Sequence, residues 1–259
     1  MPELPDLQAF RHNLEKALLQ KKLKSLTVVN AKKLHTTPEA LQEALEGQTL
    51  EHIRRVGKEL HFEFKNGHVL GMHLMLHGKL YFFQKKNTEK YTIVELLFGD
   101  GTGLALTDFQ AAANVFLDPE EKEAPDAMSK EFTENYLETQ LGKKKVTIKK
   151  YLLDQHNVLG IGNAYADDIL WDARISPFSV CNKIPAKAVK ALFKSIKKIL
   201  EGAEKKILKS NPDIIHGEIR DFMLVHSSKL KESPGGAEIL KDTGGGRKTY
   251  YTDEQVLYK

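Results

Sequence analysis

Apolar residues repeat with one period in the first part of the chain and with another in the rest. Leu7, Phe10, Leu14 and Leu18 recur every three to four positions, which predicts an amphipathic helix over 6–20. Later segments rich in β-branched and aromatic residues are expected to form strands: 23–29, 60–64, 68–73, 79–84, 91–98 and 104–106. A short helix over 37–45, with a Thr cap and Pro in its first turn, separates the first two of them. Many short strands joined by turns indicate a β-sandwich or barrel.

The helical period takes over after residue 118. Residues 119–131 are rich in Pro and Glu with few apolar side chains, which is typical of a linker. Helices are then predicted over 133–141, 147–153, 163–171 and 186–210. Near the end, short alternating segments flank a run of glycines and predict a β-hairpin. The predicted fold class is therefore α+β, with an N-terminal helix and β-sandwich domain over 1–118, a linker over 119–131, a helical domain over 132–226 and a hairpin over 227–259.

Composition supports a globular protein and excludes several classes. The chain has 259 residues, of which 41% are hydrophobic and 29% charged, and no run approaches a membrane span of about 20 apolar residues. The N-terminus lacks a basic-then-apolar signal pattern, so we expect a cytoplasmic protein with no membrane partner. The single cysteine, Cys181, excludes an internal disulfide. A net charge of +4 is weak evidence for a nucleic-acid partner, because lysine clusters are usually solvated helix faces.

The first residues carry the most informative chemistry. If Met1 is removed, Pro2 becomes a chain-terminal secondary amine beside the carboxylate of Glu3. Such an amine can attack a sugar carbon and form an iminium, and its reference pKa near 8 leaves a useful fraction neutral at pH 7. The ordinary alternative is a processed start followed by a helix entry at Pro5 and Asp6. These residues alone favour the ordinary alternative.

Other motifs, spread along the chain, suggest anion binding. Gly160 and Gly162 allow a tight turn before Asn163, which is expected to cap a helix whose first N–H groups can hold a phosphate. Lys58 opens a strand after a glycine, and Arg247 lies at the hairpin tip, where its guanidinium can bind a phosphate through two N–H groups. Each has an ordinary interpretation too: a packed turn, a solvent-facing lysine and a solvated loop.

Taken together, the N-terminal residues, Lys58, the turn before Asn163 and the hairpin arginine resemble the formamidopyrimidine-DNA glycosylase / endonuclease VIII family of base-excision repair enzymes. The Met-Pro-Glu-Leu-Pro start and the Gly-Ile-Gly-Asn-x-Tyr-Ala-Asp segment carry the resemblance, which covers nearly the whole chain. It implies that the helical domain is a helix-two-turn-helix DNA-binding domain. It also implies that the C-terminal hairpin stands where the family has a zinc finger.

The resemblance assigns roles to the catalytic candidates. Pro2 matches the nucleophile that attacks deoxyribose C1′, and Glu3 matches the acid that assists ring opening and later proton transfers. Lys58 matches the lysine that contacts the phosphate beside the lesion. Asp6 stands where the family usually has Glu, a carboxylate longer by one methylene, so its reach to the N-terminal amine or to water is expected to be shorter.

The resemblance likewise assigns DNA-binding roles. Asn163, preceded by Gly162, matches the phosphate-binding asparagine, and Arg247 matches the arginine that grips the flanking phosphates. Family members fill the gap left by a flipped base with bulky side chains, and here Leu76 or His77 is expected to do so, with Phe109 or Gln110 as alternatives. Alanines occupy the loop where the family has Arg and Phe, so the side chains that fill the base gap are expected to be fewer than in the family.

The metal ligands of the family finger are absent. The positions that align with its four cysteines hold Ser233, Gly236, Thr252 and Gln255. Only Gln255 offers a plausible donor, whereas a structural zinc site needs four ligands. We therefore expect a zincless finger, no metal and no other cofactor.

The predicted function is a bifunctional DNA glycosylase and abasic-site lyase. It would remove oxidised bases through a Schiff base on Pro2 and cleave the strand by β/δ-elimination, acting as a monomer on damaged double-stranded DNA, with nucleoid association through that DNA. One alternative is a lyase restricted to abasic sites or single strands, with weak glycosylase activity. Another is a damaged-DNA-binding protein that has lost catalysis.

Overall fold

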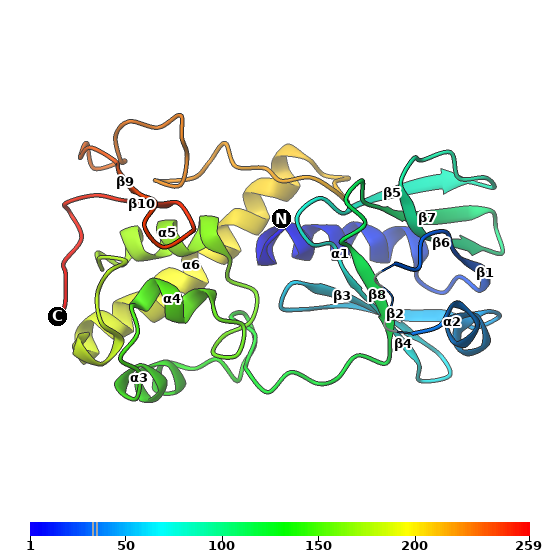
Figure 1. Cartoon of the computed structure of the whole chain (residues 1–259), viewed down its shortest axis with the longest axis horizontal. Helices are drawn as coiled ribbons and strands as arrows, with labels where there is room; N and C mark the ends of the chain where they lie inside the picture. The colour runs from blue at the N-terminus through cyan, green and yellow to red at the C-terminus, as the bar shows by residue number, and fades with distance from the viewer. Residues whose placement is uncertain (33, 35) are drawn as a thin grey trace. The chain divides into compact units, whose positions relative to one another are not determined.

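A computed structural model describes residues 1–32, 34 and 36–259 of the chain. It divides the chain into two compact units, residues 1–121 with 207–218, and residues 122–206 with 219–259 (Figure 1). The domain boundaries predicted from the sequence, at residues 118, 131 and 226, were drawn on a different basis from this division and remain predictions. Antiparallel sheets dominate the first unit and helices the second, so the predicted α+β class is confirmed.

The first unit contains two four-stranded antiparallel sheets. Their strand orders are β1-β6-β7-β5 and β2-β3-β4-β8. The strands are β1 (Leu23–Val28), β2 (Leu50–Val56), β3 (Glu59–Phe64), β4 (Val69–His73), β5 (Lys79–Gln84), β6 (Thr92–Phe98), β7 (Thr102–Thr107) and β8 (Asn114–Leu117). Helix α1 (Leu4–Leu18) lies beside the sheets, and α2 (Pro38–Leu45) begins where Thr37 caps it by accepting a hydrogen bond from the Ala40 amide.

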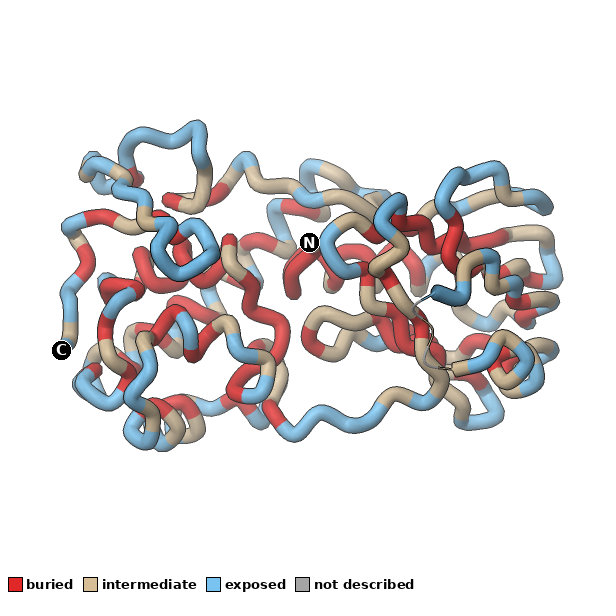
Figure 2. Tube along the Cα trace, in the orientation of Figure 1, coloured by how far each residue is buried: buried red, intermediate tan, exposed pale blue. Residues whose placement is uncertain are grey.

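One apolar core joins α1 to both sheets. Phe10 of α1, Phe62 of β3 and Phe98 of β6 are fully buried in the same cluster. Burying a side chain of this size contributes roughly 1.5–3 kcal/mol. Figure 2 shows the buried residues running along α1 and the strands, with exposed residues in several of the loops that join them. The start of α1, which carries the candidate catalytic residues, is therefore fixed to a packed scaffold.

Helix α1 begins two residues earlier than its apolar period predicts. Glu3 is the N-cap, and its amide donates to Asp6 Oδ2 at 2.8 Å while the Glu3 carboxylate accepts in return from the Asp6 amide. This reciprocal capping box satisfies two helix N–H groups and sets the boundary. At the other end, Gln20 adopts a left-handed backbone with φ of 62°, which prevents the helix from continuing to residue 20.

Strands β2 and β8 were not predicted. A register shift between Leu50 and His52 breaks the alternation of β2, so that only Leu50 and Ile53 are buried. Strand β8 has four residues and follows a run of alanines, which gives it too little pattern to recognise. Both strands belong to the sheet that supports α1.

A segment from later in the chain completes the first unit. Residues 207–218 pack there, with Ile215 in its core and the Ile214 carbonyl accepting from Asn13 of α1 at 2.9 Å. His216 Nδ1 lies 2.9 Å from the Leu80 carbonyl. These contacts bring the loop after the long helix to the N-terminal region, an arrangement that local sequence patterns do not reveal.

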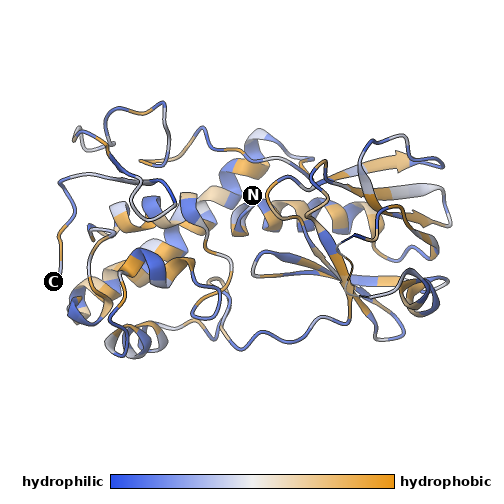
Figure 3. Ribbon diagram, viewed as in Figure 1, coloured by the Kyte–Doolittle hydropathy of each residue, from blue (hydrophilic) through white to orange (hydrophobic). Residues whose placement is uncertain are grey.

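The second unit is built on helices. They are α3 (Glu134–Gly142), α4 (Ile148–Leu153), α5 (Asn163–Asp172), the short 3₁₀ helix η1 (Cys181–Lys183) and most of α6 (Ala186–Ser210). Apolar side chains of α6 are buried every three or four residues, as in Val189, Leu192 and Ile196, and Figure 3 shows its mixed apolar and polar faces. In the part of the chain that the structure describes, no helix is both long and apolar enough to cross a membrane.

A two-stranded antiparallel hairpin completes the second unit. Strand β9 (Leu240–Asp242) pairs with β10 (Thr249–Tyr251), and both are shorter than the segments 237–241 and 247–252 whose alternation predicts the hairpin. Tyr250 of β10 is buried against Trp171 of α5 and Val225. The hairpin thus packs on the helix that begins at Asn163.

Candidate functional site

The N-terminal candidates lie together at the start of α1. Pro2 and Glu3 are buried, and Asp6 has no solvent exposure. The carboxylate of Asp6 holds the Glu3 amide rather than extending toward solvent. The unpaired N–H groups of a helix N-terminus favour negative charge, so both carboxylates are compatible with this position.

Glu218 also reaches the N-terminus, and sequence reasoning missed it. Its carboxylate pairs with the amine of Met1, within the first unit. The residue immediately after Met1 is Pro2, so a carboxylate remote in sequence lies about one residue from the candidate nucleophile. No local motif marks Glu218, because the contact spans 217 positions.

Lys58 lies in the tight turn between β2 and β3. Gly57 precedes it with φ of 59°, a left-handed conformation that glycine adopts without strain. Arg55 braces this turn, donating to the Gly57 carbonyl and to Gln8 Oε1 of α1, both at 3.0 Å. Lys58 is therefore carried on a rigid turn that is fastened to the helix bearing Glu3.

Two loops of the first unit bring Leu76, His77 and Phe109 to the surface. Leu76 and Phe109 are 59% and 60% exposed, and the rings of His77 and Phe109 lie 4.7 Å apart between centroids. Buried Asp108 organises the second loop by accepting from the amides of residues 110, 112 and 113. Two of the side chains considered for filling a base gap, His77 and Phe109, therefore lie against each other, and Asp108 supports the loop that carries Phe109.

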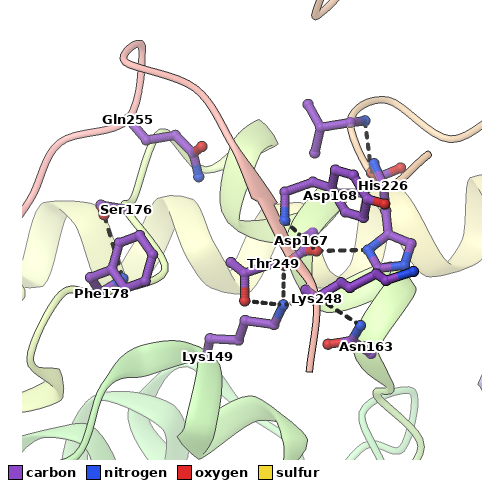
Figure 4. A network of polar contacts seen from close by, with 12 residues as sticks. Lys149, Asn163, Asp167, Asp168, Ser176, Phe178, His226, Lys248, Thr249 and Gln255 are labelled. Carbon is purple, nitrogen blue, oxygen red and sulfur yellow. Dashed lines mark hydrogen bonds and ion pairs between the residues drawn. The ribbon is translucent and has the colours of Figure 1, made fainter. Parts of the chain in front are cut away.

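The remaining candidates, Gly162, Asn163 and Arg247, lie in the second unit. Asn163 does not cap α5 as expected: Gly162 is the N-cap and Asn163 is the first helical residue. Its side-chain amide instead donates to the Lys248 carbonyl at 2.9 Å (Figure 4). An amide nitrogen has two N–H groups, so this bond ties Asn163 to the hairpin and uses only one of them.

A buried ion pair also anchors this hairpin. Lys149 Nζ lies 2.6 Å from Asp167 Oδ1 and donates to Thr249 Oγ1 at 2.9 Å (Figure 4). Asp167 Oδ2 accepts from the Tyr250 amide at 2.9 Å and lies 2.6 Å from His226 Nδ1. These contacts join α4, α5 and β10 in one network. Arg247 stands exposed just before this anchored strand, and it lines a cavity of about 500 Å³.

A second carboxylate of α5 anchors a different loop. Asp168 accepts from three backbone amides, those of Leu224, Val225 and His226, at 2.7–3.1 Å. Burial raises the pKa of Asp168. The three hydrogen bonds lower that pKa, but by less than burial raises it. The sequence motifs assigned no role to Lys149 or to either aspartate, although Asp167 closes the motif that carries the resemblance and two acidic residues inside an apolar helix are a recognisable signal of buried pairing.

Three of the four positions that the resemblance matches to zinc cysteines have side-chain partners. Ser233 and Thr252 both donate to Glu254, and Gln255 bonds the Thr252 amide and the Ile175 carbonyl. Among the described residues, no group of three or more His, Cys, Asp or Glu is placed to hold a metal ion. The residues present therefore do not fit a zinc ion.

Comparisons with known proteins agree with this architecture. The family model for the formamidopyrimidine-DNA glycosylase N-terminal domain matches residues 1–115, and that for the formamidopyrimidine-DNA glycosylase H2TH domain matches residues 124–211. A curated formamidopyrimidine-DNA glycosylase of Ligilactobacillus salivarius is 36% identical over 217 residues, covering 77% of this chain and 76% of that protein. Its Bacillus subtilis counterpart is 31% identical, with 97% of each chain covered.

Solved structures give the same result in three dimensions. The Lactococcus lactis enzyme, solved in complex with DNA containing an abasic site, matches with a TM-score of 0.87 and 30% identity. That match covers 98% of this chain and 100% of the other. The chain belongs to the formamidopyrimidine-DNA glycosylase / endonuclease VIII family.

Proposed function

We propose that this chain is a DNA glycosylase of base-excision repair that also cleaves the strand at abasic sites, with damaged double-stranded DNA as its partner. The observation that carries the proposal is the position of Pro2 and Glu3, buried side by side at the start of α1. Family membership supports the glycosylase class. The relative solved with abasic-site DNA supports a substrate of that kind.

The proposed reaction begins once Met1 is removed. The neutral amine of Pro2 attacks deoxyribose C1′, a C–N bond forms, and the glycosidic bond breaks as the base leaves with its electron pair and takes up the proton that the amine nitrogen loses. Glu3 protonates the ring oxygen, so the sugar opens to an iminium. The iminium withdraws electrons and acidifies the C2′ proton, whose loss expels the 3′-phosphate. Loss of a C4′ proton then expels the 5′-phosphate, and water releases Pro2.

Asp6 has a positioning role in this proposal. Its carboxylate holds the Glu3 amide at 2.8 Å and is fully buried, so it orients the catalytic acid through the capping box. Shortening the family's usual glutamate to aspartate is compatible with this role, because the hydrogen bond spans three residues of one helix turn.

Lys58, Asn163 and Arg247 are proposed to bind DNA phosphates. Each is a cation or an amide donor held by a fixed backbone: a braced turn, the start of α5 and a hairpin anchored by Lys149. Phosphate contacts of this kind give register and affinity without reading the base sequence. Gly162 contributes by letting the backbone at the start of α5 approach the strand closely.

The salt dependence of DNA binding tests the role of Arg247. We expect Arg247→Ala to reduce the slope of log affinity against log salt concentration by about 0.9, the release of counterions from one phosphate contact. Titrations of a labelled abasic-site duplex at several salt concentrations measure this slope. Lys24→Ala removes one positive charge from an exposed position of β1 and should leave the slope unchanged. An unaltered slope in the Arg247 variant would remove it from the DNA-binding surface.

Phe109 is proposed to support base extrusion together with Leu76 and His77. Aromatic stacking on a base contributes about 1–3 kcal/mol, so Phe109→Ala should slow excision of an oxidised base from duplex DNA by roughly 10- to 100-fold. Cleavage of an abasic single strand, which needs no extrusion, should change little. The comparison is made by single-turnover assays, with exposed Phe82 changed to Ala as the control. Equal losses on both substrates would contradict a role in extrusion.

A panel of substrates tests the proposed function and separates its alternatives. The panel comprises duplexes with an oxidised purine, an oxidised pyrimidine or an abasic site, and the same lesions in single strands. A glycosylase and lyase releases bases and cleaves the duplex. A restricted lyase acts only on abasic or single-stranded substrates, an outcome that the alanines at positions 111–113 favour. Binding that falls with salt, without any cleavage, would identify a protein that has lost catalysis.

A further inference from the structure

Glu254 forms the polar centre of the zincless finger. One of its oxygens, Oε2, accepts hydrogen bonds from Ser233 Oγ at 2.7 Å, Trp171 Nε1 at 2.8 Å and Thr252 Oγ1 at 3.1 Å. The other, Oε1, pairs with Arg174 Nη1 at 2.7 Å. All of these residues lie in the second unit.

The donors come from segments that are remote in sequence. Trp171 belongs to α5 and Arg174 follows its C-terminal end, whereas Ser233 precedes β9 and Thr252 follows β10. Two of them, Ser233 and Thr252, stand where the resemblance places cysteines of the family finger. One carboxylate therefore connects both ends of the hairpin to α5.

We propose that Glu254 takes the structural place of the zinc ion and is the positioning residue that fixes the hairpin carrying Arg247. The charge and the direction of donation are opposite in the two kinds of centre. A zinc ion is a cation that gathers lone-pair ligands, whereas Glu254 is an anion that gathers N–H and O–H donors. The expected effect of Glu254 on DNA binding rests on the role proposed above for Arg247. The proposal that Glu254 holds the hairpin in place does not.

The surroundings of Glu254 are organised for this arrangement. The guanidinium of Arg174 lies over the Trp171 ring, 4.5 Å from its centroid, so the two α5-side donors hold each other. Arg174 has φ of 58°, a conformation that a non-glycine residue keeps only where its environment fixes it. Ser233 Oγ also accepts from the amides of Gly235 and Ala237, which ties the turn before β9 to the same centre.

Acid should weaken this centre. Hydrogen bonds from the Ser233 hydroxyl and then from Trp171, Arg174 and Thr252 lower the pKa of Glu254 from 4.5 to about 2. A lowered pKa adds stability above the unfolded value, and that stability is lost as pH falls toward the folded value. Arg174 is the charged group that faces Glu254 from the α5 side, and Trp171, Ser233 and Thr252 face it as neutral donors. The stability difference between wild type and Glu254→Gln should therefore be constant above about pH 5 and shrink below it.

The tryptophan gives a direct readout, because Trp171 is the single tryptophan of the chain. In Glu254→Gln its indole N–H should shift in the proton–nitrogen NMR spectrum, and its exchange with solvent should accelerate by about tenfold. Asp253→Asn makes the same charge change at the exposed neighbouring residue and should leave the indole signal in place. An unchanged indole signal in folded Glu254→Gln would overturn the proposal, as would one zinc ion per chain in the purified protein.

The effect on DNA binding is measured separately. If Glu254 positions Arg247, Glu254→Gln lowers the salt slope as Arg247→Ala does, and the double variant shows no further loss. A simply less stable protein would instead keep the wild-type slope when assayed well below its unfolding temperature. If the indole signal moves but neither variant alters the slope, the proposed phosphate contact is wrong while the structural centre stands. Additive losses in the double variant would contradict positioning through Glu254.

Discussion

An N-terminal extension joined to Pro2 abolishes both base excision and strand cleavage, and its removal restores them. This is the largest effect we expect, because the extension turns the Pro2 nitrogen into an amide that has no nucleophilic lone pair. Loss of a catalytic nucleophile lowers turnover by roughly 10⁴-fold or more. The experiment uses an extension that a specific protease removes to leave Pro2 as the first residue. Single-turnover rates are measured before and after cleavage, with complete processing verified by intact mass.

The design separates chemistry from binding. The extended protein should still bind an abasic-site duplex, because Lys58, Asn163 and Arg247 are unchanged. If the extended protein is as active as the processed one, the nucleophile is not Pro2. Glu3→Gln provides a second comparison: the amine remains available to attack, but opening of the sugar to the Schiff base and the later steps that need proton transfer should slow by about 10²- to 10⁴-fold.

Lys149→Met destabilises the protein more than any surface substitution, by about 3–5 kcal/mol. Lys149 and Asp167 are both buried, and their pair is joined by bonds to Thr249 and the Lys248 carbonyl. Methionine has a similar volume but no charge, so Asp167 is left as a buried carboxylate without its main cation. Urea unfolding monitored by circular dichroism measures the loss, with the denaturant slope checked for two-state behaviour.

A matched lysine provides the control. Lys198 also pairs with an aspartate of α5, Asp172 at 2.7 Å, but its side chain is 70% exposed. An exposed ion pair contributes about 0–1 kcal/mol, so Lys198→Met should remain close to wild type. Similar effects from both substitutions would show that burial of the Lys149 pair does not govern stability. The Lys149 variant should also weaken DNA binding, because its network fixes β10 next to Arg247 and Lys248.

Local patterns in the sequence predicted the elements whose causes are local. The cap at Thr37 defines α2, and the spacing of Val189, Leu192 and Ile196 defines α6 over its full predicted length. Where two neighbouring residues can both cap a helix, the predicted cap can be wrong by one position. Asn163 is a good capping residue, yet Gly162 takes the cap and the asparagine side chain binds the hairpin carbonyl 85 positions away.

The parts that could not be predicted depend on contacts between distant residues. Lys149 meets Thr249, 100 positions later, and Glu218 meets the N-terminus across 217. The sequence indicated that zinc ligands were missing, but it gave no sign that Glu254 would collect the donors that replace them. The residues proposed to act on DNA were found through the family resemblance. The residues that hold them in place, such as Lys149 and Glu254, were found only in the structure.

The proposed Schiff base is tested by reducing the reaction with borohydride during turnover and mapping the trapped adduct on the protein. An abasic-site duplex is used as substrate, and the cross-linked protein is digested and sequenced by mass spectrometry. We predict one deoxyribose remnant on the α-nitrogen of Pro2 in a chain that lacks Met1. An adduct on a lysine side chain such as Lys58, or strand cleavage by a protein that retains Met1, would contradict catalysis by the Pro2 amine.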